Sequence, residues 1–239
     1  MYTVGKTALS LAVLVLVASV GLAQGRGFPG LGGATDGPVL ILNKSVQDEL
    51  KLNDDQKADL KKIADKQAET IQKIFEDLRA GGTFDRDKIQ EAMKKIQEDA
   101  NKAVAKTVDG LKDDQKKRFK QIQVQVKGIR AFSDDELTKD LKLTDKQKDD
   151  IKEQTGDLTK DIAEIFKDLP RGDAKAREEA QKKVADLTKM AMDKITGSLT
   201  DAQKKTWKDM NGEKFDLKMD AFPGFPGKDK GKGDKTDKF

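Results

Sequence analysis

The sequence predicts an all-α protein made of two tandem units, in each of which long amphipathic helices form antiparallel hairpins. Charged residues make up 38% of the chain and aromatic residues 5%, a composition that favours long solvated helices over a large mixed core. The strand formers Val, Ile, Tyr and Trp are sparse outside the N-terminal segment. Finally, one short motif recurs at a nearly fixed interval, which indicates an internal repeat.

The repeated motif is Leu-x-Asp-x-Gln followed by Lys. Its four copies are Leu52–Gln56, Leu111–Gln115, Leu143–Gln147 and Leu199–Gln203. The first and third copies start 91 residues apart, and the second and fourth start 88 residues apart. We therefore interpret residues 43–131 and 133–219 as two copies of one helical unit.

Residues 1–23 have the features of a secretory signal peptide. Lys6 lies near the start, an apolar run follows over residues 8–20, and small residues precede the expected cleavage between Ala23 and Gln24. The apolar run is about 13 residues long, which is shorter than the ~20 residues that a membrane-spanning helix needs. We expect a periplasmic or otherwise exported protein with no stable membrane insertion after cleavage.

Two segments rich in small and polar residues flank the helical body. Residues 24–42 are expected to be a flexible Gly/Pro-rich leader. Residues 220–239, rich in Lys and Gly, lack the apolar surface to offset the entropy of ordering and are expected to be disordered.

The first unit should contain a short helix and three longer ones. Val46 and Leu50 mark the short helix. A helix of about 26 residues should start at Asp54 and end at Gly81-Gly82, since its apolar residues recur every three or four positions. Asp85 is the expected N-cap of the next long helix, and a third helix should follow the second motif.

The second unit should repeat this order. Ser133–Glu136 has the form of a capping box that opens it. Leu137 and Leu141 then stand where the first unit has its short-helix residues. Further along, Asp173 stands where the last long helix needs an N-cap, and this role accounts for the Arg-Gly-Asp tripeptide that it closes.

The motif has the chemistry of a helix start. Thr144 or Thr200 would be the N-cap, and the motif Gln would stand at position N3 and accept a bond from the N–H of the cap residue. Asn53 can cap equally well, whereas Lys112 cannot, so the second copy should be the weakest. Because Lys follows each Gln at N4, the motif Leu has no local apolar partner and should be buried against another helix, most simply its hairpin partner.

The composition also excludes several functions. The chain has no Cys and no His, so thiol chemistry and imidazole bases or ligands are absent, and no nucleophile–base pair stands out. We therefore expect no enzyme activity, no cofactor and no defined metal site, with weak oxygen-ligand metal binding left open. The body between signal peptide and tail is nearly neutral and shows no basic face, so no nucleic-acid binding is expected.

Paired Leu-Thr-x-x-Gln motifs in a small, exported, helical chain resemble the Spy/CpxP family of periplasmic proteins. The resemblance covers most of residues 43–217, although the first two copies lack Thr. It implies a curved helical dimer per pair of units, and a function as an ATP-independent chaperone or as an inhibitory partner of an envelope stress sensor. Two units in one chain would form either a monomeric pseudo-dimer or a homodimer.

The leading hypothesis is therefore a chaperone-like protein that binds partly unfolded proteins on an amphipathic helical surface. The candidate client contacts are Phe119, Ile122, Trp207 and Met210, which follow the second motif of each unit; simple core packing is the alternative for them. A regulatory adaptor for one folded partner and a structural helical spacer are the other two hypotheses.

Overall fold

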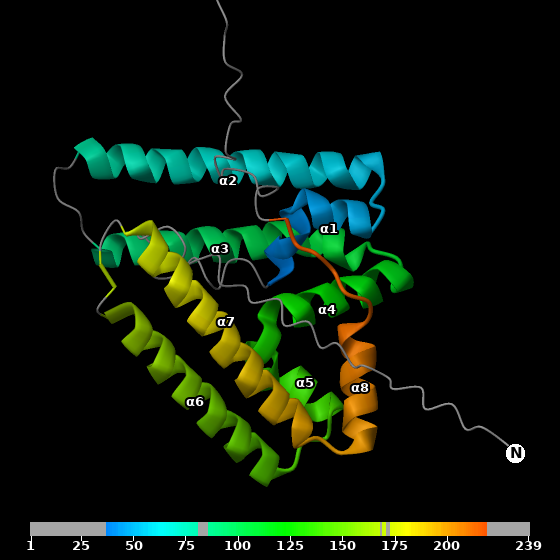
Figure 1. The fold of residues 1–239 in the computed structure, drawn as a ribbon. Coiled ribbons are helices and arrows are strands. Elements are labelled where there is room, and N and C mark those ends of the chain that lie inside the picture. The colour runs from blue at the N-terminus through cyan, green and yellow to red at the C-terminus, as the bar shows by residue number, and fades with distance from the viewer. Residues whose placement is uncertain (1–36, 81–85, 168, 171–172, 219–239) are drawn as a thin grey trace, which may run out of the picture.

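The computed structural model describes residues 37–80, 86–167, 169–170 and 173–218 (Figure 1). Within these residues every regular element is a helix, so the all-α prediction is confirmed. The elements are η3 (Pro38–Leu42), α1 (Lys44–Glu49), α2 (Asp54–Ala80), α3 (Arg86–Asp109), α4 (Asp113–Lys127), η4 (Gly128–Ser133), α5 (Asp135–Asp140), α6 (Asp145–Lys167), α7 (Ala174–Gly197) and α8 (Asp201–Asn211), where η denotes a 3-10 helix.

The order of elements is the same in the two halves of the chain. We call η3 to α4 unit 1 and η4 to α8 unit 2. In each unit a 3-10 helix and a short α-helix precede two long helices and a shorter last one. The turn after the short helix has the same conformation as well: Lys51 and Lys142, 91 residues apart, both have φ = 50°.

The two long helices of each unit pack against each other, α2 against α3 and α6 against α7. In Figure 1 both hairpin ends point away from α8, while α4 and α8 lie together on the other side. These last helices, α4 and α8, make the main helix–helix contact between the units.

The apolar stripes of the helices build two cores. Core 1 holds buried side chains of η3 and α1 to α4 together with Phe215. Core 2 holds buried side chains of η4, α5, α6 and α7 together with the leucines of the unit 2 motifs, and Trp207 and Met210 of α8 pack against it. Each 3-10 helix thus contributes to the core of the unit that it opens.

The last five residues of the expected flexible leader form a helix, η3. Residues 24–42 were predicted to be flexible, but Pro38–Leu42 is helical and four consecutive side chains in it are at most 6% exposed. The reason is the run Val39-Leu40-Ile41-Leu42, whose burial in core 1 outweighs the Gly/Pro-rich character of the preceding residues.

The start of unit 2 is also corrected. The N-cap of α5 is Asp134 rather than Ser133, and its side chain does not cap the helix. Instead Asp134 accepts a 2.6 Å bond from the ammonium of Lys127, and Glu136 accepts a 2.7 Å bond from Lys120. The acidic residues of the expected capping box therefore join α5 to α4.

Two other expected N-caps are confirmed. Asn53 and Asp173 cap α2 and α7, and the Asp173 side chain accepts a 3.0 Å bond from the N–H of Ala176. The signal peptide, the Gly81-Gly82 stop, the Asp85 cap and the tail over 220–239 lie outside the described residues.

A segment that the sequence did not single out follows α8. Residues 212–218, which we call the return segment, run without regular secondary structure from α8 in unit 2 back to unit 1 (Figure 1). Phe215 of this segment is 7% exposed in core 1, and Leu217 packs against the same core. The last described residues thus complete the core of the first unit.

Candidate functional site

In unit 2 the two motif copies form complete capping boxes. The N–H of Thr144 donates to Gln147 Oε1 (3.0 Å), and the N–H of Gln147 donates to Thr144 Oγ1 (3.2 Å). Thr200 and Gln203 make the same pair of bonds, at 2.9 and 3.3 Å. Both have the reciprocal form that the motif predicts.

In unit 1 the first copy is complete and the second is half-formed. Asn53 and Gln56 exchange bonds of 3.0 and 2.8 Å. At the second copy the N–H of Lys112 donates to Gln115 Oε1 (3.0 Å), but the Lys side chain has no acceptor to return the bond. The second copy therefore lacks one cap interaction, as the sequence suggests.

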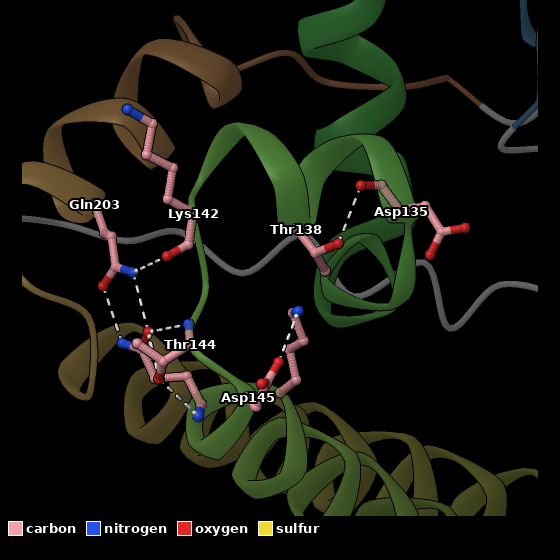
Figure 2. A network of polar contacts seen from close by, with 8 residues as sticks. Asp135, Thr138, Lys142, Thr144, Asp145 and Gln203 are labelled. Carbon is pink, nitrogen blue, oxygen red and sulfur yellow. Dashed lines mark hydrogen bonds and ion pairs between the residues drawn. The ribbon is translucent and has the colours of Figure 1, made fainter.

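The two motifs of unit 2 also meet each other (Figure 2). Gln147 Nε2 donates to Gln203 Oε1 (2.9 Å), and Gln203 Nε2 donates to Gln147 Oε1 (3.0 Å). Gln203 further donates to the carbonyl of Lys142 (3.3 Å), and Gln147 to that of Ser198 (3.2 Å). The motif glutamines thus tie the start of α6 to the start of α8, a tertiary role that the sequence reading missed.

In unit 1 one glutamine has the corresponding role. Gln115 is 9% exposed, and its Nε2 donates to the carbonyl of Leu50 (2.8 Å), 65 residues away. The same side chain accepts the bond from Lys112. Gln115 therefore holds the start of α4 against the turn after α1.

The motif leucines are all buried, between 3% and 6% exposed. Leu52 and Leu111 belong to core 1, and Leu143 and Leu199 to core 2. This burial agrees with the sequence, in which the Lys at N4 leaves each motif Leu without a local apolar partner. The motif as a whole is a device that caps a helix and fastens its first turn to a core.

The candidate client contacts are buried in unit 1 and half-buried in unit 2. Phe119 and Ile122 are 2% and 0% exposed in core 1, as the core-packing alternative expects. Trp207 and Met210 are half-buried against core 2, and the Trp207 ring lies 4.4 Å from that of Phe132. The apolar side of the last helix thus faces the core of its own unit.

Partly exposed apolar residues also lie along the hairpin of unit 2. On α6 and just beyond it a stripe of apolar residues is only half-buried: Ile162, Ile165, Phe166 and Leu169. The main described neighbours of α6 are α7 and η4, and these two elements leave part of the apolar face of α6 uncovered. On α7, Met190 is 67% exposed. We call the four side chains on and just beyond α6 the arm stripe; Ile162 of this stripe also packs on core 2.

Several of the described charged groups form surface pairs. Across the described parts of the chain no group of three or more acidic residues could hold a metal ion. The Lys120–Glu136 pair is solvent-exposed; its hydrogen bond and the attraction of the two charges raise the pKa of Lys120 and lower the pKa of Glu136. Both shifts are those of a surface ion pair joining α4 to α5.

No helix within the described ranges has the length and apolar character to cross a membrane. The fold and the motif pairs together define an all-α protein of two packed helical-hairpin units. Comparison of the chain with family models, with characterised proteins and with solved structures gives no match.

Proposed function

We propose that the protein is an exported, ATP-independent holding chaperone that binds partly unfolded proteins on the amphipathic surface of its helical hairpins. The observation that supports the proposal is the arm stripe. Half-buried aliphatic and aromatic side chains lie there among exposed Lys, Glu and Asp side chains, and such a surface makes weak, adaptable contacts without a fixed pocket. Export is proposed from the N-terminal signal sequence, and the resemblance to Spy/CpxP proteins agrees with both parts.

The position of the stripe suits this function. Both hairpin ends point to one side of the molecule, away from the α4–α8 contact that joins the units (Figure 1). A client bound along the hairpins would leave that contact undisturbed. The protein could therefore hold and release clients without unfolding.

The test is suppression of the aggregation of a chemically denatured client without ATP. We expect suppression by the wild type at a few-fold molar excess, and a clear loss in the double variant Ile165→Ser/Phe166→Ser. The control Glu153→Ser places the same new residue at an exposed position of α6 and should retain full suppression. The melting temperatures of both variants show whether α6 is intact.

Absence of suppression by the wild type would contradict the chaperone proposal. Capture of a single folded partner from an envelope extract, with no effect on aggregation, would favour the adaptor hypothesis instead.

A further inference from the structure

Unit 1 holds the return segment through the segment's backbone. At its start, the carbonyl of Glu213 accepts bonds from Arg118 Nη1 (2.8 Å) and Gln125 Nε2 (2.7 Å). The N–H of Phe215 donates to Gln125 Oε1 (2.9 Å). One Gln amide thus pairs with a carbonyl and an N–H two residues apart, as a neighbouring strand would. Arg118 is itself held by a 2.7 Å ion pair with Glu49.

The end of the segment is held in the same way. Asn43, fully buried, donates from Nδ2 to the carbonyl of Lys218 (2.8 Å), and the N–H of Lys218 donates to Ser45 Oγ (3.3 Å). Asn43 Oδ1 already accepts bonds from Ser45, so the amide is fixed by capping α1. The five bonds from unit 1 to the return segment all reach its backbone atoms, which every amino-acid sequence has.

The side chains of the segment alternate. Phe215 enters core 1 and Leu217 packs on it, while Lys214, Asp216 and Lys218 are exposed. Main-chain bonds supplemented by contacts for alternate side chains are a general way to bind an extended peptide. The surface of unit 1 that makes these contacts, which we call the seat, has that form.

We infer that the seat is a binding site for an extended segment of another polypeptide with large apolar residues at alternate positions, and that the return segment occupies the seat as a built-in competitor. The inference rests on the proposed function, because it names the class of client segment. Backbone bonds make the site tolerant of sequence, and the apolar contacts favour chains whose core residues are exposed.

Release of the return segment breaks five hydrogen bonds to its backbone and exposes Phe215, and two features of the chain ease it. The segment is joined to α8 through Gly212, whose φ of 62° marks a turn rather than a continuing helix. The chain has no Cys, so no disulfide fastens the segment. A client must compete only with an intramolecular ligand, whose advantage is its effective concentration.

The seat belongs to unit 1 alone. At the positions 91 residues after Asn43 and Ser45, unit 2 has Asp134 and Glu136. Both acidic side chains are paired with lysines of α4 and cannot donate to a peptide carbonyl. A client segment should therefore bind once per chain.

The first experiment follows the return segment in the full chain. Because the protein lacks Cys, Asp216→Cys gives a single site for a spin label at an exposed position. We expect the label to be ordered in the free protein and to become mobile when a denatured client is added in excess. A label at Asp145→Cys on α6 is the control and should not change. Unchanged order at residue 216 with saturating client would overturn the inference.

The second experiment measures binding to the emptied seat. The probe is a fluorescein-labelled peptide with the sequence of residues 212–218, and the protein is full-length Phe215→Ser/Leu217→Ser. We expect saturable binding of one peptide per chain, at least about tenfold tighter than to the wild type, whose own segment competes. A peptide with Ser in place of Phe and Leu should bind much more weakly, and Gln125→Ala in the double variant should weaken binding of the original peptide.

The outcomes separate the seat from the chaperone proposal. No peptide binding by a double variant with wild-type helical content would overturn the inference, while aggregation suppression by the wild type would still support the proposed function. Peptide binding by a chain that suppresses no aggregation would support the seat and contradict the proposed function. Label release accompanied by dimerisation, without bound client, would overturn the inference in favour of exchange between two copies.

Discussion

At the scale of single residues, the helix caps of the four motif copies differ by one hydrogen bond. Three have a side-chain acceptor at the cap, and Lys112 has none. The backbone of Lys112 is nevertheless extended, with φ = −66° and ψ = 160°, nearly the same as at Thr200. The position is therefore already shaped for a capping residue.

Lys112→Thr should stabilise the protein. The new hydroxyl can accept the N–H of Gln115 and complete the box, which is worth about 0.5–2 kcal/mol at an N-cap. Thr200→Lys is the reciprocal control and should lower stability by a similar amount. Urea denaturation followed by circular dichroism measures both; equal stabilities of Lys112→Thr and the wild type would show that the cap is not limiting.

Gln115→Ala should cost more than Gln56→Ala. Both variants lose the bond that caps a backbone N–H, but only Gln115→Ala also leaves the carbonyl of buried Leu50 without its donor. An unsatisfied buried polar group costs about 1–3 kcal/mol. The same denaturation experiment compares the two, and equal losses would contradict the tertiary role of Gln115.

At the scale of elements, α4 and α8 end in the same way with different surroundings. Gly128 and Gly212 follow them with φ values of 56° and 62°, where any side chain is strained. A Cβ at Gly128 would meet nothing within 4 Å, whereas one at Gly212 would lie 2.2 Å from the Gln121 amide group. Gln121 donates a 2.9 Å bond to the carbonyl of Asp209 in α8.

Gly212→Ala should therefore be more harmful than Gly128→Ala. Both variants carry the cost of placing a side chain at a positive φ that glycine alone adopts readily, about 1–3 kcal/mol. Gly212→Ala must also displace Gln121 and lose its bond across the α4–α8 contact, a further ~0.5–1.5 kcal/mol. Thermal unfolding of the two variants tests the difference, and a larger loss for Gly128→Ala would contradict this account of the α4–α8 contact.

The elements that could be predicted are those with local signals. Asn53 and Asp173 fix helix starts through their own side chains, and helical apolar spacing sets the face that each long helix buries. The helix at Pro38–Leu42 was missed because the Gly/Pro-rich residues before it dominated the interpretation. The sequence did contain a signal for burial, the four successive aliphatic residues Val39 to Leu42, because aliphatic residues are among those most often buried.

Other features have no local signal. Gln147 and Gln203 bond each other although they are 56 residues apart in the sequence. The return segment is held by a bond between Asn43 and Lys218, which are 175 residues apart. Capping explains each motif glutamine fully, so nothing in the sequence called for a second partner. Phe119 is buried and Trp207 is partly exposed, although they stand at equivalent positions of the two units. This difference likewise depends on what packs beside each helix, because Phe215 joins core 1 from outside unit 1.

At the scale of the whole molecule, the units pair within one chain through α4, α8 and the return segment. We predict that the purified protein is a monomer whose mass does not change with concentration, because these contacts are already satisfied internally. Multi-angle light scattering over a wide concentration range is the measurement. An obligate dimer would show that the contact surface of each unit still requires a second chain.

The route of the return segment also has a consequence for biogenesis. Asn43 is made early and Lys218 near the end of the chain, yet they are joined by a hydrogen bond, and core 1 contains Phe215. During synthesis, unit 1 therefore forms with part of its core missing, because all the helices of unit 2 are made before Phe215, which completes that core. Unit 1 can therefore finish folding only after unit 2 has been made. A truncated chain that stops after α8 would leave an apolar opening in core 1, the core of the unit that is made first.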